Sequence, residues 1–456
     1  MDRQLRFVRN IAAGYYASNW TPAGFRASMQ RATGRLYRWA PALAKRLVAA
    51  HPQPPAFAAL LQFLEQDADL VRVLAKLARS RKAEDRFPVR TIFPVPTDPT
   101  PPSPTWAAHL PQWATEHDCA AALGVTLPRL LWLADPTGRN TVQRDERLRT
   151  YRSRWVPKRR GGARLLEIPT PLLRRTQRRL LDHLLNHVTP HPAVHGFRPG
   201  RSAITNAAEH CGRVVVVRFD LTDFFPSVPA PRVYQLFRTL GYPDAVVRLL
   251  GGLCTTRLPR AGWDARPNPA LDGSDYPAWA RLNARHLPQG APTSPALANL
   301  VAFRLDRRLA GLAAACGATY TRYADDLTFS GGEELRRSAM RLARRVALVA
   351  AEEGFGVNRG KTRVLGRGGR QTVTGVVVNV RPNVPRPDFD LLKAILTNCV
   401  RHGPAAQNRA NVPDFRAHLA GRVSHVAAVN PVRGRALWAL FDRIAWPAPT
   451  SLQLPL

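Results

Sequence analysis

Two adjacent acids within a short apolar stretch restrict the fold of this chain more than any other feature. Asp325 and Asp326 lie between Ala324 and Leu327 within residues 320–330. The aromatic and β-branched residues around them favour β-structure, so the stretch predicts two short strands joined by a turn that carries the acids. Neighbouring carboxylates in an apolar hairpin repel each other and resist burial, and divalent cations would relieve this conflict. A solvated Asp-Asp turn is the simpler interpretation of such a pair taken alone.

A second stretch upstream supplies another acid in a similar setting. Residues 214–219 form an apolar, β-branched run that only Arg218 interrupts, which predicts a largely buried strand. Asp220 follows where this strand meets its loop. Together with Asp325 and Asp326 it gives three carboxylates from two segments. Such a set of oxygen ligands can hold two hard cations, as nucleotidyl transfer requires.

The stretches around these acids resemble the polymerase motifs of reverse transcriptases. The matching segments are Phe-Asp-Leu-Thr-Asp-Phe-Phe-Pro-Ser at 219–227, Leu-Pro-Gln-Gly-Ala-Pro-Thr-Ser-Pro at 287–295 and Tyr-Ala-Asp-Asp at 323–326. Two shorter segments narrow the resemblance to retron reverse transcriptases. Residues 206–210 are similar to their Asn-Ala-x-x-His signature, and residues 373–375 to the Val-Thr-Gly of their thumb-side region. The resemblance extends from about Trp155 to about Trp446.

This resemblance implies an α+β right-hand polymerase with fingers, an antiparallel palm sheet and a thumb. We expect fingers and palm at 147–380 and a helical, RNA-binding thumb at 381–456. Residues 252–285 are expected to form an irregular surface insertion between motifs. A group II intron or abortive-infection reverse transcriptase is the enzymatic alternative. A catalytically idle RNA-binding scaffold is the alternative from another class, and the intact set of acids speaks against it.

The region before the polymerase motifs resembles no family, and its organisation is inferred from composition. Residues 1–87 are expected to be a basic helical extension, in which Leu60, Leu64, Val71 and Leu74 recur at helical spacing. One interpretation is that this extension binds RNA or a partner protein. The other is that it only presents a basic face to solvent. Residues 88–105 are rich in proline and predict an extended linker. Residues 106–146 predict short helices, with a helix–turn–helix pattern at 115–133. This pattern is typical either of a pair of helices that packs in the protein or of a unit that recognises DNA.

The resemblance assigns the chemistry to four residues. Asp220, Asp325 and Asp326 would be the catalytic acids and the ligands of two Mg²⁺ ions, for which Mn²⁺ could substitute. Lys361 stands in the lysine position of a later family motif, where a lysine near departing pyrophosphate can act as a general acid. The substrates implied are deoxynucleoside triphosphates.

Five residues are candidates for nucleotide binding. Residues 155–169 predict a β-hairpin with Gly161-Gly162 in its turn, and Lys158 and Arg164 could contact the triphosphate. A generic basic hairpin is the alternative. Phe225 matches a bulky family residue that crowds the ribose 2′-OH, unless it simply packs in the core as Phe224 could. Gln289 could hydrogen-bond nucleotide or template, and Gly290 permits close approach of the backbone to a ligand.

Seven residues are candidates for contact with template or RNA. Arg198 and Arg201 lie in a loop of residues 195–202 that the family uses to handle template. Asn206 and His210 carry one retron signature, although spacing alone would make them a satisfied polar pair at i, i+4. Val373, Thr374 and Gly375 carry the other.

The overall charge indicates a polyanionic partner. The chain has 67 Lys and Arg against 32 Asp and Glu, a formal net charge of +35, which suits nucleic acid. Its five cysteines show no metal-ligand spacing and are typical of reduced thiols in a cytoplasmic protein. No apolar run approaches a membrane span, so no membrane partner is expected. The retron resemblance further implies a cognate non-coding RNA copied into branched RNA–DNA from a guanosine 2′-OH, and an effector protein encoded nearby in anti-phage defence.

Overall fold

The computed structural model describes residues 3–446 apart from 17, 19, 53–54, 56, 81–86, 89–108, 137, 139, 141–142, 144, 159–162 and 268–275. Almost all of the predicted linker at 88–105, and the Gly161-Gly162 turn, therefore lie outside the described residues. The chain divides into two units. Unit 1 comprises Met1–His191, Thr222–Arg307 and Ala347–Gly356, and unit 2 comprises Pro192–Leu221, Arg308–Val346 and Val357–Leu456.

The N-terminal part of unit 1 is helical, as its periodicity predicts. Its helices are α1 (Arg3–Tyr16), α2 (Pro22–Thr33), α3 (Ala40–Ala50), α4 (Phe57–Gln66) and α5 (Ala68–Ala78). They share one core, which includes Phe7, Ile11, Tyr15, Phe25, Met29, Leu43, Leu47, Leu60 and Leu64. Asp67 separates α4 from α5 because its carboxylate accepts the N–H of Leu70 at 2.9 Å and caps the second helix. Val71 falls on the outer side of α5 and is 44% exposed.

The predicted helix–turn–helix segment forms α7 (Glu116–Ala122) and α8 (Leu127–Ala134). Thr115 and Asp118 make a capping box that begins α7. Both helices pack on α12 (Asp244–Cys254). At Gly252 an added Cβ would lie only 2.2 Å from the carbonyl oxygen of Ala134, so glycine is required for this close packing. The buried faces of α7 and α8 are thus explained by packing within the unit.

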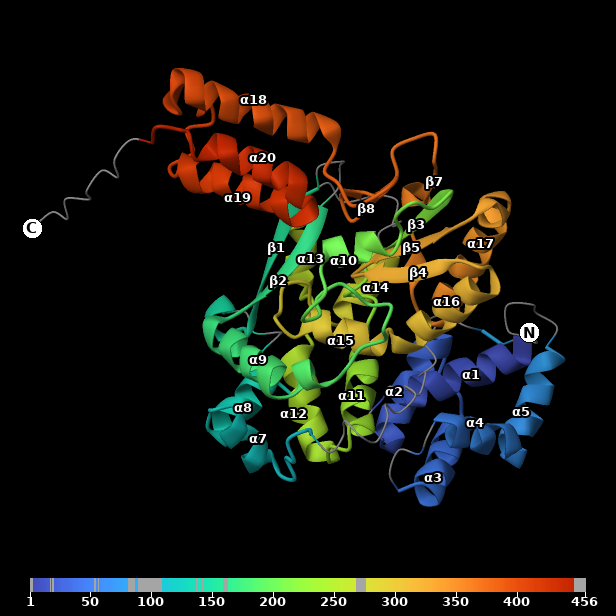
Figure 1. Cartoon of the computed structure of the whole chain (residues 1–456). Coiled ribbons are helices and arrows are strands. Elements are labelled where there is room, and N and C mark those ends of the chain that lie inside the picture. The colour runs from blue at the N-terminus through green and yellow to red at the C-terminus, as the bar shows by residue number, and fades with distance from the viewer. Residues whose placement is uncertain are drawn as a thin grey trace, which may run out of the picture. The chain divides into compact units, whose positions relative to one another are not determined.

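A long β-hairpin and several further helices complete unit 1. Strands β1 (Tyr151–Pro157) and β2 (Ala163–Pro169) pair antiparallel, and α9 (Pro171–His183) follows them (Figure 1). The other helices in this part are α11 (Ala230–Thr239), α13 (Arg260–Asp264), α14 (Tyr276–Asn283) and α15 (Ser294–Val301). The prediction of an irregular insertion at 252–285 is therefore wrong in part. Buried Trp263, which packs against Trp155 of β1 and Trp279 of α14, gives this segment a core of its own.

An antiparallel sheet organises unit 2. Its order is β4 (Thr319–Tyr323), β5 (Asp326–Gly331), β3 (Val215–Thr222) and β6 (Gly356–Val357), and β7 (Arg363–Gly366) also pairs with β3. Alternation puts Val217, Phe219 and Leu221 on a buried face, while Arg218 and Asp220 point to the other. Helices α16 (Phe303–Ala315) and α17 (Glu333–Glu352) flank the β4–β5 hairpin in the sequence.

The C-terminal part of unit 2 is helical from residue 386. Helices α18 (Arg386–His402), α19 (Phe415–Val429) and α20 (Pro431–Phe441) lie side by side (Figure 1). They share a core with a short hairpin of β8 (Thr372–Val373) and β9 (Val376–Val377) and with Ala207 of α10 (Ala203–Ala208). This packing joins the C-terminal helices to the rest of unit 2.

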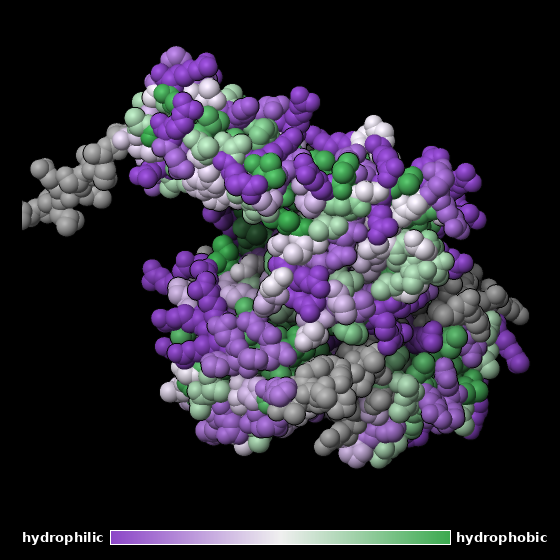
Figure 2. Space-filling view, in the orientation of Figure 1, coloured by the Kyte–Doolittle hydropathy of each residue, from purple (hydrophilic) through white to green (hydrophobic). Residues whose placement is uncertain are grey.

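Hydrophilic residues are spread across the visible face of the molecule (Figure 2). Among the described residues, no helix combines the length and apolar character needed to cross a membrane.

Candidate active site

The two adjacent acids lie in a tight hairpin, as the sequence predicts. The acidic hairpin, residues 319–331, consists of β4 and β5 joined by Ala324 and Asp325. Ala324 has a φ of 55°, which such a short connection requires at its first position. The fully buried guanidinium of Arg322 donates to the Ala324 carbonyl at 3.1 Å and supports the turn.

Gly196 lets the loop of residues 195–202 pack closely against this turn. A Cβ added to Gly196 would lie 2.6 Å from the main-chain nitrogen of Ala324, closer than any side chain can approach. Strand pairing continues nearby through the His195 N–H, which donates to the Arg322 carbonyl at 2.9 Å. The loop of residues 195–202 is therefore fixed to the acidic hairpin through the main chain.

The sheet brings the three predicted carboxylates together. Asp220 and Asp326 are cross-strand partners in the β3–β5 ladder, so their side chains share one face of the sheet. The N–H of Leu221 donates to the carbonyl of Asp325 at 2.9 Å and holds the turn beside the end of β3. Burial raises the pKa of Asp325, and the negative charges of Asp220 and Asp326 raise it further. The cluster is thus electrostatically unfavourable by itself.

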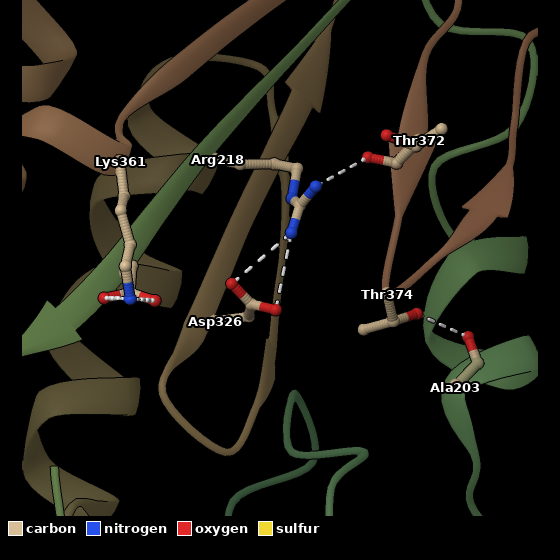
Figure 3. Close-up of polar contacts among 7 residues, drawn as sticks. Ala203, Arg218, Asp326, Lys361, Thr372 and Thr374 are labelled. Carbon is tan, nitrogen blue, oxygen red and sulfur yellow. Dashed lines mark hydrogen bonds and ion pairs between the residues drawn. The ribbon is translucent and has the colours of Figure 1, made fainter. Parts of the chain in front are cut away.

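Two cations partly neutralise the cluster (Figure 3). Lys361 donates to both carboxylate oxygens of Asp220 at 2.9 Å. Arg218 approaches both oxygens of Asp326 at 3.4 Å and also donates to the Thr372 carbonyl at 3.4 Å. Burial raises the pKa of Asp326, and Arg218 opposes that shift. Lys361, which the sequence predicts at this site, therefore lies with the acids. Arg218 also lies with them, although in the sequence it only interrupts an apolar run.

The donors of this cluster fit a hard divalent cation. Carboxylate oxygens are the ligands that Mg²⁺ prefers, and Mg²⁺ usually takes only one or two carboxylates together with substrate phosphates. Among the described residues, no three His, Cys, Asp or Glu side chains are grouped closely enough to enclose one ion. A cation bound at Asp220, Asp325 and Asp326 would therefore take further ligands from substrate phosphates and water.

The template-loop candidates have different surroundings. Arg201 is exposed and donates to Nε2 of the buried His195 at 3.4 Å, while Nδ1 of that ring donates to Thr205 at 2.9 Å. Burial, helped by Arg201 and Arg198, lowers the pKa of His195 to about 4, so the ring is neutral. Burial also lowers the pKa of Arg198. Arg201 is the more accessible of the two arginines for a phosphate.

The retron signature at 206–210 is enclosed. The side chains of Asn206 and His210 are both fully buried. His210 contacts both strands of the acidic hairpin, with Nδ1 2.7 Å from Ser330 Oγ and Nε2 2.7 Å from Thr321 Oγ1. Burial lowers the pKa of His210 to about 3, which keeps the imidazole neutral. The expectation that Asn206 and His210 touch RNA is therefore corrected, because neither side chain reaches the surface.

The second signature lies next to the first. Val373 is fully buried in the core of the C-terminal helices, which corrects its expected contact with RNA. Thr374 Oγ1 donates to the Ala203 carbonyl of α10 at 2.9 Å (Figure 3). Gly375 is exposed and has a φ of 84°. The two retron signatures thus meet at α10.

The nucleotide-binding candidates belong to unit 1. Lys158 and Arg164 are exposed at the end of the β1–β2 ladder where the two strands connect, and Arg164 pairs with Val156. The Gln289 carbonyl accepts the Glu167 N–H of β2 at 2.9 Å. A Cβ at Gly290, whose φ is 134°, would lie 2.9 Å from the Glu167 carbonyl. The close approach expected of Gly290 is therefore to the main chain of β2.

The two phenylalanines after Asp220 are placed differently. Phe224 is 4% exposed and packs on Phe355 with 5.5 Å between ring centroids. Phe225 stays partly exposed. One ring therefore packs in the core, and the other remains accessible, as a residue that contacts a sugar must be.

A buried ion pair between His286 and Glu167 is not predicted by the sequence. His286 Nε2 donates to Glu167 at 2.9 Å and Nδ1 donates to the Ala284 carbonyl at 2.8 Å. Burial disfavours the charged ring, but Glu167 and the carbonyl raise the pKa of His286 overall. The pair supports the loop of Gln289 and Gly290 against β2. Its partners are far apart in sequence, so no local sequence pattern identifies the pair.

The position of Arg218, in contrast, could be predicted from the sequence. A charged residue two positions before Asp220 in a strand lies on the same face of the sheet as Asp220.

Known proteins resemble this chain over most of its length. The family described as "Reverse transcriptase (RNA-dependent DNA polymerase)" matches residues 156–378. Retron Mx65 reverse transcriptase of Myxococcus xanthus is 44% identical over 328 residues, which cover 72% of this chain and 71% of that protein. Retron Mx162 reverse transcriptase of the same organism is 37% identical over 349 residues, covering 73% and 68%.

More distant relatives include Retron Ec86 reverse transcriptase of Escherichia coli, which is 31% identical over 231 residues, covering 50% of this chain and 63% of that protein. A telomerase structure from Candida albicans aligns over 63% of this chain and 56% of its own, with a TM-score of 0.32 and 10% identity, too distant to support an argument. The closer similarities confirm the family resemblance of the motifs around Asp220 and Asp325. This chain belongs to the retron reverse transcriptases and is an RNA-directed DNA polymerase.

Proposed function

We propose that this chain copies part of a cognate structured RNA into DNA at the carboxylate cluster of Asp220, Asp325 and Asp326. The observation that carries this proposal is the convergence of the three acids from β3 and the acidic hairpin, with raised pKa values for Asp325 and Asp326 that a bound cation would relieve. Two Mg²⁺ ions, when bound, would lower the pKa of the attacking hydroxyl and stabilise the triphosphate and the leaving pyrophosphate. Asp220 and Asp325 would be the main ligands, and Asp326 would complete the set.

Other residues of the chain would orient the substrates. Lys361, which lies 2.9 Å from Asp220, would give a proton to departing pyrophosphate. Lys158 and Arg164 would contact the triphosphate, for which exposed cations are suited. Phe225 would crowd a ribose 2′-OH and so favour deoxynucleotides. Gln289 would contact nucleotide or template.

The polymerase regions follow from the same assignment. The β1–β2 hairpin and the helices around it would form the fingers, the sheet of unit 2 the palm, and α18–α20 the thumb. Residues 1–87 would be an N-terminal extension that precedes the polymerase. These names describe roles in holding primer and template, and they rest on the family rather than on a bound nucleic acid.

The retron part of the proposal concerns the RNA. The chain would bind one non-coding RNA, prime synthesis from a guanosine 2′-OH within it, and produce a branched RNA–DNA molecule. It would act in the cytoplasm beside an effector protein in anti-phage defence. The support is the similarity over about two thirds of two retron reverse transcriptases and of this chain. Arg201, on the loop beside the acidic hairpin, and Gly375 of the second signature are exposed, so both would be accessible to RNA.

The carboxylate assignment is tested with Asp325→Asn. This variant should lose deoxynucleotide incorporation on a primed RNA template, while its affinity for that template stays close to wild type. Asp442→Asn, which removes an acid at the end of α20, is the matched control and should polymerise normally. Incorporation by Asp325→Asn at the wild-type rate would refute the assignment.

The retron assignment needs a separate experiment. The protein is purified from a host that carries its native locus, and the RNA that accompanies it is sequenced and probed for a 2′,5′ branch. We expect a single transcript from the neighbourhood of the gene, joined to short DNA. A random mixture of RNAs without a branched product would overturn the retron role and leave general reverse transcription intact.

A further inference from the structure

The turn between β8 and β9 holds an unfavourable residue in a specific contact. Thr374 and Gly375 both have positive φ, 48° and 84°. A two-residue turn of this kind favours asparagine and glycine, and a β-branched residue at positive φ is a genuine outlier. The Thr374 hydroxyl donates to the Ala203 carbonyl at 2.9 Å, a bond that glycine could not make. Backbone strain retained together with a defined contact points to a role for that contact.

One connection leads from this hydroxyl to the acidic hairpin. Ala203 is the first residue of α10, a helix of six residues that Ser202 and Thr205 cap reciprocally. His210 follows shortly after that helix and is hydrogen-bonded to Thr321 on β4 and to Ser330 on β5, both at 2.7 Å. The neutral ring of His210 thus connects the two strands that carry the acids, and α10 connects His210 to the β8–β9 turn.

A second connection runs through the main chain of β8. The Thr372 carbonyl accepts from Arg218 at 3.4 Å, and the same guanidinium reaches both oxygens of Asp326 at 3.4 Å (Figure 3). Arg218 is 25% exposed, so these bonds are shielded in part from water. Both connections start within three consecutive residues of β8 and its turn, and both end on the acidic hairpin.

We propose that the β8–β9 hairpin positions the acidic hairpin for catalysis, with Thr374, His210 and Arg218 as its positioning residues. Within the Val-Thr-Gly signature, buried Val373 and the Thr374 hydroxyl act on the acids through protein contacts rather than by touching nucleic acid. This inference rests on the catalytic assignment of Asp325 and Asp326 made above. Displacement of reacting groups by about 1 Å can cost ~100-fold in rate, so small shifts of this hairpin have measurable effects.

The test uses the full-length chain and three substitutions of one residue. Thr374→Val deletes the hydroxyl and keeps the shape, and it should lower kcat about tenfold at saturating substrates. The Kd for primed RNA template and the KM for deoxynucleotide should change by less than about twofold. The substitution leaves unchanged the contacts that hold both substrates equally in the ground state and the transition state. Thr374→Ser should restore most of the rate. Thr374→Gly relaxes the strained backbone, so it should keep the thermal midpoint and still lose rate.

Two further substitutions make the result specific. Thr239→Val removes a comparable hydroxyl that donates to the Gln235 carbonyl at 3.0 Å in α11, and it should leave kcat unchanged. Thr321→Val removes one hydroxyl that His210 contacts while avoiding the loss of the buried ring. The rate loss of the double variant Thr374→Val with Thr321→Val should be smaller than the product of the single losses, because both lie on one connection.

Three results would overturn the proposal. A weaker Kd for primed template with an unchanged kcat would make Thr374 a nucleic-acid contact. An unchanged kcat and Kd, or a loss that serine does not rescue, would remove the hydroxyl from catalysis. These failures differ from failure of the catalytic assignment. That assignment fails only if Asp325→Asn polymerises, whereas here Asp325→Asn would remain inactive.

Discussion

Each acid of the cluster has a different charge environment. Asp220 is paired with Lys361 and Asp326 with Arg218. Among the described residues, no lysine or arginine side chain forms an ion pair with Asp325. Burial raises the pKa of Asp325, the charges of Asp220 and Asp326 raise it further, and Lys361 opposes the shift. A bound cation would stabilise the ionised form of this side chain.

Asp325→Asn should therefore stabilise the protein while it abolishes activity. Loss of the repelling charge should raise the thermal midpoint at pH 7 by about 1–3 °C when divalent cations are chelated. Scanning calorimetry or fluorescence would measure it, and added Mg²⁺ should raise the midpoint of wild type more than that of the variant. A lower midpoint for Asp325→Asn under chelation would contradict the proposed repulsion.

Phe225 should control the choice of sugar. Its ring remains partly exposed while Phe224 occupies the core, so trimming Phe225 should open space without unfolding the protein. Phe225→Ala or Phe225→Val should increase ribonucleotide incorporation relative to deoxynucleotide by about tenfold or more, within the range that one steric contact controls. Single-nucleotide incorporation measures the ratio. If discrimination is unchanged, another residue excludes the 2′-OH.

His210 should make stability depend on pH in the acid range. Its pKa in the folded state is about 3, below the ordinary value of 6.5. Between these values the unfolded chain binds a proton that the folded chain does not, so stability falls as the pH is lowered from about 6.5 towards 3. His210→Gln should be less stable at pH 7 and should lose less further stability on acidification. Unfolding midpoints at pH 7 and pH 5 would show this, and equal slopes for both proteins would contradict it.

At the scale of elements, the loop of Gln289 and Gly290 depends on β2. Gly290 has a φ of 134°, and a Cβ added there would lie only 2.9 Å from the Glu167 carbonyl. Gly290→Ala should therefore cost about 1–3 kcal/mol in the free energy of unfolding. Gly311→Ala in α16 is the control, because nothing lies within 4 Å of its Cβ and alanine favours a helix. Urea denaturation of both variants would test this, and a neutral Gly290→Ala would show that the loop is not fixed by β2.

At the scale of the whole molecule, attraction to any RNA and selection of one RNA should depend on different features of the chain. A net charge of +35 gives strong attraction to any phosphate backbone, and such attraction falls steeply with salt. Selection of one folded RNA needs shape and unpaired bases instead. We expect the segment from Val373 through residue 446, with its three long helices, to supply that selection.

Exchange of residues 373–446 for those of another retron reverse transcriptase should redirect which RNA is copied. Synthesis on a generic primed template should be retained in the chimaera. Competition between the two cognate RNAs at about 0.2 M salt would measure the change, because general attraction is weak there. If the chimaera still copies the original RNA, selectivity lies elsewhere in the chain.

The amino-acid sequence by itself determined the features that depend on neighbouring residues. A run of apolar, β-branched residues predicted β3, and β-favouring residues around the two acids predicted the acidic hairpin. Helical periodicity predicted the N-terminal helices, and the family resemblance implied the C-terminal ones. The polymerase motifs predicted that Asp220, Asp325 and Asp326 belong together, and the structure places two of them as cross-strand partners.

Only the tertiary structure decided which polar residues are enclosed. His210 contacts Thr321 and Ser330, which lie 111 and 120 residues away, and Thr374 contacts Ala203 across 171 residues. In the sequence, an asparagine and a histidine four residues apart look the same whether their helix faces water or a sheet. Their burial depends on which strands the short helix packs against. That choice is made by the packing of the entire unit, because a local pattern specifies a face of an element but not what covers it.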